Sequence, residues 1–323
     1  MKYGRLTTLI VLIFFSGCTQ LTEVKSLKLA HGLDVTHPVH KSMEYMAELV
    51  ALKSDGQLKL EIYPSQQLGT ERQCLELLQI GSLAMTKVSA AVMENFAPNI
   101  QVFSLPYIFR GREHHYKVLD GEVGKKLLVQ SEQYWLRGLT YFDAGQRSFY
   151  AKEPINIPAD LQDKKIRVQE SVTAMNLVRS LGGAPTPISY GELYTALQQG
   201  IVDGAENNPP SFYTSRHYEI CKYYTLNEHT AVPDILVIGT VAWNNLSEQE
   251  QGWIQEAADE AKTYQRKLWL KAEQEALDAV QAAGVEIIRP DKGPFFEKTK
   301  ELLDAYKDQP EKYALIQEIQ AIQ

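Results

Sequence analysis

The chain lacks the motifs that identify the common nucleotide-binding and hydrolytic enzymes. It contains no Walker A loop, no G-x-G-x-x-G dinucleotide fingerprint, no G-x-S-x-G nucleophile elbow and no H-E-x-x-H metal motif. It also lacks a run of basic residues and any low-complexity segment, which argues against a nucleic-acid surface and against disorder. The sequence therefore gives no support to these motif-defined functions.

An excess of positive charge is missing as well. Lys and Arg total 33 against 40 Asp and Glu, which gives a formal charge of −7. Because the overall field is negative, any affinity for anions must come from individually placed arginines. With 323 residues, 44% of them hydrophobic, the chain is long enough for one large domain or two modest ones.

The N-terminus has the composition of an export signal. Lys2 and Arg5 precede an apolar run at 9–15 that is too short to span a bilayer, and Ser16 and Gly17 lead into Cys18. We predict a signal peptide over residues 1–17 and lipidation of Cys18, whose context is similar to a bacterial lipobox. Ordinary cleavage nearby is the alternative. Residues 18–26 then form a linker close to the lipid.

Cysteine is scarce beyond this segment. Cys74 and Cys221 are the two that follow it, and an exported protein is in a compartment that permits disulfides. The two are far apart in the sequence and fall in different predicted lobes. We therefore predict buried free thiols.

Short apolar runs alternate with helical patterns, which is typical of an α/β protein. Thr70 and Gln73 form a capping-box pattern at a helix start, and Gly81 predicts its end. The run "QVFSLPYIF" at 101–109 reads as a strand. A second lobe is predicted to begin near Gly145, with the strand-like 235–243 returning to the first lobe.

The segment 247–283 predicts one unusually long helix. Ser247 and Glu250 form a capping box, and apolar residues follow at helical spacing. At 1.5 Å per residue this helix would extend about 55 Å, longer than one small domain is wide, so we predict that it bridges both lobes. Two helices broken near Gly252 or Tyr264 are the alternative.

Histidine pairs give little evidence of a metal site. His37 and His40 are three residues apart in "HPVH", but no third ligand is evident and Pro38 suits a helix start. His114 and His115 are predicted to lie on a solvent-exposed helix. The sequence predicts neither a metal nor another cofactor.

Arg167 stands in an unexpected place, inside the short apolar strand of "KKIRVQES". A guanidinium where a strand meets a loop offers parallel donors that match a carboxylate. The alternative is a surface ion pair with Glu170 or another local acid.

Several stretches together carry a family resemblance. They are "YPSQQLGTERQCLELLQIGSLAM", "FSLPYIFR", "GQRSFY", "KKIRVQES", "APTPISYGELYTALQQGIVDGAENNPP" and "YEICKYYTLNEH". In this order they resemble the solute receptors of tripartite ATP-independent periplasmic (TRAP) transporters, of the DctP type. The likeness extends over nearly all of the chain after the signal peptide, and 184–208 is its most specific part.

The resemblance implies a two-lobed periplasmic binding protein, an α/β fold of type II-like class with a long helix spanning both lobes. Lobe I would comprise 27–144 plus 233–262, and lobe II 145–232 plus 263–323. Such a receptor closes on an organic acid and presents it to a membrane permease, without covalent chemistry.

The resemblance also implies roles for particular residues. Arg167 matches the family arginine that holds the ligand carboxylate, with Arg147 and Asn207 as its partners. Glu71 and Tyr190 match positions that often touch the rest of the ligand. The alternatives are a scaffold ion pair for Arg147, a turn at Asn207, helix-dipole stabilisation by Glu71 and plain packing of Tyr190.

The polar candidates favour a sugar acid as ligand. Glu71, Glu170, Ser89 and His37 would suit the hydroxyl groups of a polyol that carries a carboxylate, such as a hexuronate. A C4-dicarboxylate, with Arg147 as a second cation, or a 2-keto acid is the alternative. The "RVQES" motif departs from the "RVP" of many dicarboxylate and sialic-acid receptors, so their ligands are not transferred here.

Two other functions stay open at this point. The same closed form is suited to a sensor accessory read by a membrane kinase. A secreted hydrolase or lyase would use His37 with Asp34 or Glu71.

Overall fold

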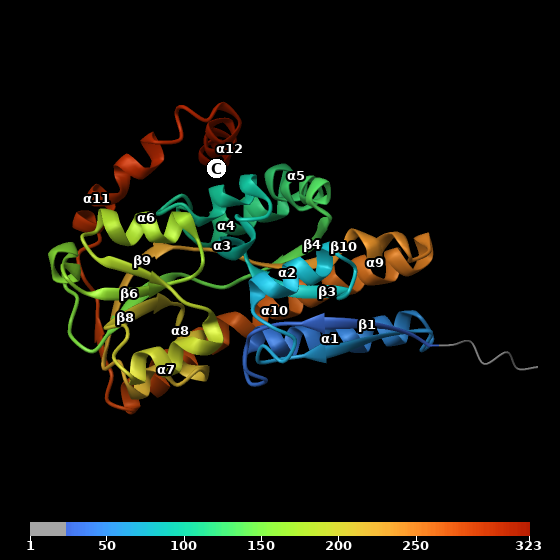
Figure 1. Cartoon of the computed structure of the whole chain (residues 1–323), viewed down its shortest axis with the longest axis horizontal. Coiled ribbons are helices and arrows are strands. Elements are labelled where there is room, and N and C mark those ends of the chain that lie inside the picture. Colours follow the sequence, from blue (N-terminus) through green and yellow to red (C-terminus); the bar gives the residue numbers. More distant parts are fainter. Residues whose placement is uncertain (1–23) are drawn as a thin grey trace, which may run out of the picture.

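The computed structural model describes residues 24–323, which form two lobes, each built around one mixed β-sheet (Figure 1). The predicted signal peptide and Cys18 lie outside these residues. Strand β1 already begins at Lys25, inside the segment predicted as a linker. Within residues 24–323, none of the helices is long and apolar enough to cross a membrane.

The sheet of lobe I has the strand order β2-β1-β3-β10-β4. Its first three strands are parallel, and β10 runs antiparallel to both of its neighbours. The strand that returns from lobe II therefore lies inside the sheet. The predicted return of 235–243 to lobe I holds for the strand, which ends at Gly239, whereas residues 240–243 belong to a helix. The bounds are β1 (Lys25–Ala30), β2 (Leu58–Tyr63), β3 (Met85–Ser89), β4 (Leu136–Phe142) and β10 (Asp234–Gly239).

The sheet of lobe II has the order β11-β9-β5-β8-β6-β7. Strands β6, β7 and β8 are parallel to one another, whereas β5 is antiparallel to β8 and β9. The bounds are β5 (Arg147–Ala151), β6 (Lys165–Val168), β7 (Ala184–Pro187), β8 (Gly204–Asn207), β9 (Tyr223–Thr230) and β11 (Glu286–Ile288).

Helices cover both faces of each sheet, with a separate apolar core on each face. The α/β class is confirmed. The helices are α1 (Pro38–Lys53), α2 (Glu71–Gln79), α3 (Ala90–Met93), α4 (Arg112–Asp120), α5 (Glu122–Gln130), α6 (Val172–Ser180), α7 (Leu193–Gln198), α8 (Pro209–Thr214), α9 (Thr240–Asn244), α10 (Glu248–Ala282), α11 (Gly293–Asp304) and α12 (Pro310–Ala321), with short 3-10 turns at Pro98–Ser104, Ser131–Tyr134, Pro158–Leu161, Tyr190–Glu192 and His217–Glu219.

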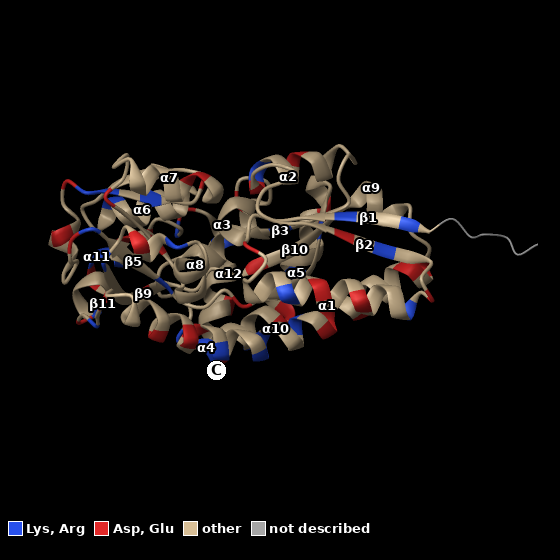
Figure 2. Ribbon diagram, turned by 90° about the horizontal axis from the view of Figure 1, so that it is seen from below, with Lys and Arg blue, Asp and Glu red and all other residues tan. Residues whose placement is uncertain are grey.

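Helix α10 is continuous over 35 residues, so the prediction of one long helix is confirmed and the broken alternative is wrong. Ser247 and Glu250 form the predicted capping box. The N-terminal half of α10 packs in the core of lobe I against α1, and Val280 near its end packs in the core of lobe II. The helix runs beneath both lobes in Figure 2 and so connects them as a rod.

The short link from β4 to β5 crosses between the lobes and is held by α10. The Gln265 side chain is fully buried; it accepts a hydrogen bond from the Asp143 N–H (2.9 Å) and donates one to the Asp143 carbonyl (2.7 Å). Gly145 has a positive φ of 59°, and a Cβ there would lie 2.5 Å from Glu273 Oε1. Only glycine fits this close approach without a shift of the helix side chains.

The C-terminus returns to lobe I. Helices α11 and α12 follow β11, and Leu315, Ile316 and Ile319 of α12 are buried in the core beside α5 and the Pro98–Ser104 turn. The sequence assigned all of 263–323 to lobe II. The difference arises because α12 buries its apolar face on lobe I. The apolar periodicity of a helix shows that it has a buried face but not which lobe covers that face.

Two local predictions are wrong. Residues 101–109 form a 3-10 turn and a loop rather than a strand. Val102, Phe103 and Leu105 are fully buried there, and a short buried apolar run is equally compatible with a strand and with a helical turn. His114 and His115 do lie on a helix, α4, but both are buried. His114 bonds to the Ile319 carbonyl of α12, which covers it.

Cys74 and Cys221 are free and buried, as predicted. They belong to the cores of different lobes. Burial raises the pKa of Cys74 to about 11 and that of Cys221 to about 12, which keeps both thiols protonated and unreactive.

Replacing Gln265 by Leu should destabilise the protein by about 2–5 kcal/mol, because it leaves two buried backbone groups of Asp143 without partners. The measurement is the free energy of unfolding in urea. Gln274→Leu is the matched control on the same helix, since Gln274 is exposed and bonds to Asp278 alone. Equal losses in the two variants would contradict this account of the link.

Candidate functional site

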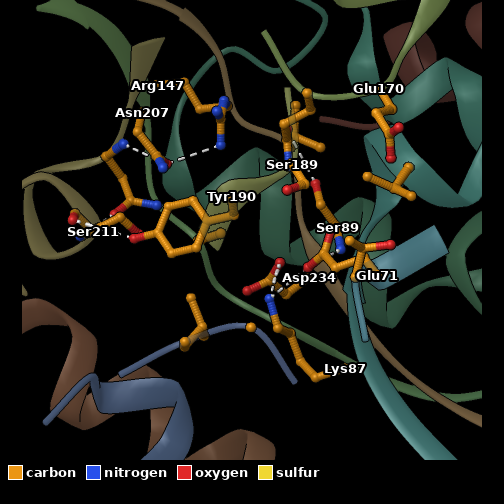
Figure 3. A pocket seen from close by; sticks show the side chains of 18 of the residues that line it. Glu71, Lys87, Ser89, Arg147, Glu170, Ser189, Tyr190, Asn207, Ser211 and Asp234 are labelled. Atoms are coloured by element: carbon orange, nitrogen blue, oxygen red, sulfur yellow. Dashed lines mark hydrogen bonds and ion pairs between the residues drawn. The ribbon is translucent and has the colours of Figure 1, made fainter. Parts of the chain in front are cut away.

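A cavity that is partly open to solvent lies between the lobes. Strands β3, β6 and β8 point their carboxyl ends at it, the usual place for ligands in α/β folds. All the predicted ligand-binding residues except His37 line it: Glu71, Ser89, Arg147, Arg167, Glu170, Tyr190 and Asn207. Figure 3 labels each of these except Arg167.

Arg167 reaches the cavity from β6, which lies between β7 and β8 in the sheet. The residue is only 2% exposed. Its Nε donates to the Ile188 carbonyl (2.8 Å), whereas Nη1 has no partner in the described part of the chain. No ion pair joins Arg167 to Glu170 or to another acid of residues 24–323, so the surface-bridge alternative is not observed. Burial lowers the pKa of this guanidinium.

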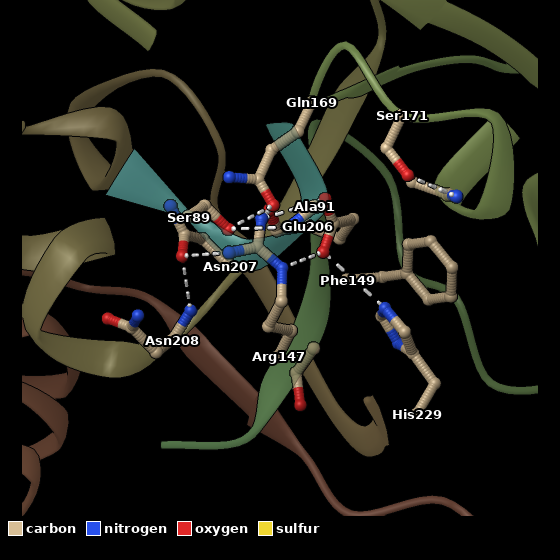
Figure 4. A network of polar contacts seen from close by, with 12 residues as sticks. Ser89, Ala91, Arg147, Phe149, Gln169, Ser171, Glu206, Asn207, Asn208 and His229 are labelled. Atoms are coloured by element: carbon tan, nitrogen blue, oxygen red, sulfur yellow. Dashed lines mark hydrogen bonds and ion pairs between the residues drawn. The ribbon is translucent and has the colours of Figure 1, made fainter. Parts of the chain in front are cut away.

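Arg147 has the opposite environment (Figure 4). Its Nε and Nη2 donate to the two carboxylate oxygens of Glu206 at 2.5 and 2.8 Å. Nη2 also donates to the Glu206 carbonyl (2.8 Å), and Nη1 donates to Asn207 Oδ1 (2.9 Å). These contacts are those of the scaffold ion pair that was the alternative prediction for Arg147, although Arg147 also lines the cavity.

Arg147 and Glu206 compensate each other's charge. Burial alone would raise the pKa of Glu206, but the charge and hydrogen bonds of Arg147, together with the nearby imidazole of His229, outweigh it and lower this pKa to about 2. Burial likewise lowers the pKa of Arg147, yet Glu206 reverses this and leaves it raised. His229 Nε2 lies 3.5 Å from Glu206 Oε2 on the far side.

Lobe I contributes a charged wall that the sequence analysis missed. Lys87 of β3 is 2% exposed, and its Nζ lies 3.1 Å from Glu71 Oε1 and 3.2 Å from Asp234 Oδ1. Glu71 also accepts a bond from the Ser89 N–H (3.3 Å). Burial and the neighbouring Glu71 raise the pKa of Asp234 to about 6, against the effect of Lys87. Lys87 is the one charged residue of β3, all five residues of which are buried, and this was the available signal.

Other cavity residues were also missed. Gln66 Nε2 is buried and has no partner among residues 24–323. Gln169 Oε1 accepts a hydrogen bond from Ser89 Oγ (3.3 Å), which joins the two lobes at the cavity wall. Polar side chains in loops of irregular structure give no periodic signal, so they could not be selected from sequence.

Tyr190 and His37, two further predicted ligand-binding residues, differ in their position. Tyr190 lines the cavity, and its hydroxyl donates to the Ser211 carbonyl (3.3 Å). His37 lies behind Ser211: its Nε2 is 3.2 Å from Ser211 Oγ, and its Nδ1 accepts from the Val39 N–H at the start of α1. His37 is thus a helix cap that supports the wall rather than part of the cavity surface.

The histidine geometry also bears on chemistry. His37 bonds to neither the Asp34 nor the Glu71 side chain, and burial lowers its pKa to about 3. A base with so low a pKa is poorly suited to proton transfer near neutral pH. His40 pairs with His31 instead (2.9 Å). Within residues 24–323, no three His, Cys, Asp or Glu side chains are grouped as metal ligands.

Glu206→Gln should lower the free energy of unfolding by about 3–5 kcal/mol at pH 7, because it leaves Arg147 buried without a counter-charge. Since the folded-state pKa of Glu206 is about 2, below the usual value of 4.5, its stabilisation is complete above pH 4.5 and is lost as the pH falls towards 2. Urea unfolding at several pH values should therefore show the gap between wild type and variant closing in acid.

The control for this experiment is Glu153→Gln, which removes an exposed partner of Lys164 in the same lobe. It should cost less than about 1 kcal/mol. A gap between wild type and Glu206→Gln that stays constant from pH 7 to pH 3 would contradict the assignment.

Comparison with known proteins agrees with this geometry. The family model described as bacterial extracellular solute-binding protein, family 7 (DctP) matches residues 29–309. The C4-dicarboxylate-binding periplasmic protein DctP of Rhodobacter capsulatus is 31% identical over 268 residues, 82% of this chain and 80% of that protein.

Solved structures are similar over almost the whole described chain. The TRAP periplasmic solute-binding protein of Xanthobacter autotrophicus, with bound β-D-galacturonate, has a TM-score of 0.90 and 34% identity, and covers 92% of this chain and 100% of its own. That of Pseudomonas putida F1, with bound D-glucuronate, has a TM-score of 0.89 and 33% identity, over 92% and 97%. The two lobes, the bridging helix and the family match lead to one conclusion: this chain belongs to the DctP family of bacterial extracellular solute-binding proteins.

Proposed function

We propose that this chain is the periplasmic receptor of a TRAP transporter and that it binds a sugar acid, a hexuronate or a close relative, in the cavity between its lobes. The observation that carries the proposal is Arg167, a buried guanidinium in the cavity wall to which residues 24–323 supply no acid. The membrane partner is the permease of the same transporter, to which the loaded receptor delivers its ligand.

A ligand carboxylate supplies what Arg167 needs. Charge-assisted bonds from a guanidinium to a carboxylate are worth about 1.5–3 kcal/mol each, and two can form in parallel. A lysine at this position has no planar fork and would offer a point charge instead. Asn207 and Arg147, which are bonded to each other beside Arg167 in the cavity wall, complete the cradle in this proposal.

The rest of the cavity surface suits hydroxyl groups. Glu71 and Ser89 of lobe I and Glu170 of lobe II line it, and Gln66 adds a buried amide donor without a partner in the described chain. Tyr190 adds an aromatic side chain with a hydroxyl. Similar receptors hold galacturonate and glucuronate, which supports a ligand with one carboxylate and several hydroxyls.

Binding without covalent chemistry is part of the proposal. The lobes are joined at the cavity wall by Ser89 and Gln169, and Glu94 of lobe I accepts bonds from Ser171 Oγ (2.7 Å) and Thr173 N (3.1 Å) of lobe II. Such contacts form as one lobe rotates towards the other, so that ligand binding and closure are coupled. The position of His37 behind the wall gives no support to the hydrolase or lyase alternative.

Export and anchoring are inferred from the N-terminus. Residues 1–17 act as the signal peptide and Cys18 carries the lipid anchor in this proposal, on the sequence pattern given above. The lobe boundaries at 144–145 and 232–233 coincide with the two short links between the sheets, which supports them as the places where the lobes rotate.

A thermal-shift screen against uronates, aldonates, sialic acid, C4-dicarboxylates and 2-keto acids should show its largest response with hexuronates. A ligand at a thousand times its Kd stabilises the folded state by about 4 kcal/mol, which gives a clear rise in Tm. A response to succinate alone would reverse the ranking of ligands in favour of the C4-dicarboxylate that the Rhodobacter capsulatus relative binds.

Arg167→Lys should weaken the binding of the best ligand at least tenfold, since it keeps the charge but loses the parallel donors. Isothermal titration gives the Kd, and the Tm of the ligand-free variant should stay close to that of wild type. Arg179→Lys, at an exposed position on α6, is the matched control and should leave the Kd unchanged. Equally tight binding by Arg167→Lys would make Arg167 a structural residue.

A further inference from the structure

In the cavity wall of lobe I, the buried ammonium group of Lys87 is already paired with two carboxylates. We name Lys87 together with Glu71 and Asp234 the Lys87 clamp (Figure 3). Lys87 and Asp234 lie on the neighbouring strands β3 and β10, where Leu236 is the residue opposite Lys87. They are therefore diagonal neighbours, close enough for a direct contact. Glu71 joins them from the first turn of α2.

All three members of the clamp line the ligand cavity, and Lys87 is contacted by both carboxylates at similar distances, 3.1 and 3.2 Å. Two acids around one ammonium leave a net negative charge when both are ionised. The ammonium has three N–H donors, and the two carboxylates occupy two of them. One donor and several acceptor lone pairs are therefore available to neutral hydroxyls.

Every cation in the cavity except one is neutralised in this way. Arg147 is paired with Glu206, and Lys87 with Glu71 and Asp234. Arg167 alone, among the cations of the described chain that line the cavity, has no carboxylate within 4 Å. A ligand with one carboxylate finds its counter-charge at Arg167. The second carboxylate of a diacid would meet acids that already hold the remaining cations.

We propose that the Lys87 clamp determines specificity at the end of the ligand remote from Arg167: it accepts the hydroxyl-bearing end of a monocarboxylate and rejects a second carboxylate. This inference rests on the proposed function, in which Arg167 holds the first carboxylate. In this inference Arg147 does not bind the second carboxylate of a diacid, because Glu206 already pairs with it. Like charges brought together in a dry cavity cost far more than the same charges in water, which is the physical source of the rejection.

Removing one acid from the clamp should change the preference. In Asp234→Asn or Glu71→Gln, Lys87 keeps one carboxylate partner instead of two, so that its ammonium group can interact with a second anion in the cavity. The ligand pairs are galacturonate with galactarate and glucuronate with glucarate. The diacid carries a carboxylate in place of the aldehyde carbon and cannot form the hemiacetal ring, so the decisive comparison is between wild type and variant for the same diacid. Isothermal titration at pH 8 keeps Asp234 ionised in the wild type, because burial raises its pKa only to about 6.

Wild type should bind the hexuronate of the preferred pair at least a hundredfold more tightly than its diacid. Each single variant should reduce this ratio at least tenfold through tighter binding of the diacid. In the double variant Lys87→Gln/Asp234→Asn the diacid should lose this gain, since no ammonium is left to receive it. Glu76→Gln, which removes an exposed carboxylate of the same helix α2, should leave the ratio unchanged.

Folding of each variant is checked by its ligand-free Tm. If Asp234→Asn does not fold, Glu71→Gln carries the test, because Glu71 lies at the more exposed end of the clamp. A wild type that binds diacid and hexuronate equally, or folded variants that keep the wild-type ratio, would overturn the clamp while leaving the carboxylate site at Arg167 intact. A wild type that binds no sugar acid at all would overturn the proposed function and the clamp with it.

Discussion

The organisation of this protein depends on a guanidinium buried without a counter-charge. Removing an ion from water is costly unless it is paired, and folded proteins normally supply the partner themselves. The chain does so for Arg147, which Glu206 grips through two bonds, but not for Arg167 on the same sheet. In the function proposed above, the partner of this cation is the carboxylate of a ligand from solution, which makes binding favourable at one defined point.

Such an unpaired charge is stable only if the surrounding frame is rigid. Strand β6 holds Arg167 between two parallel neighbours, and its Nε is fastened to the Ile188 carbonyl. Helix α10 connects the cores of both lobes, and Gln265 fixes the link beside Gly145 at which the chain crosses. The remaining freedom is a rotation of the lobes about these short links. Closure can then exclude water from the cavity, which strengthens the bonds to a bound acid.

The acidic composition of the chain is compatible with an anionic ligand because the field inside the cavity is local. Lys87 is neutralised by Glu71 and Asp234, and Arg147 by Glu206, so the cavity presents one free positive charge rather than a broadly basic surface. A long-range positive field would attract any anion. In the mechanism proposed above, the single unpaired guanidinium and the acid-rich wall together select ligands by the number and placement of their carboxylates.

Local patterns in the sequence determined much of this protein. The α/β alternation, the capping boxes at Thr70 and Ser247, the single long helix and the unusual strand arginine all follow from neighbours in sequence, because caps, periodicity and side-chain chemistry act over a few residues. Only tertiary structure decided the pairing of charges. Whether Arg147, Lys87 or Arg167 meets an acid depends on strands that are distant in the chain, as does the return of α12 to lobe I, and no local pattern encodes which of them become neighbours.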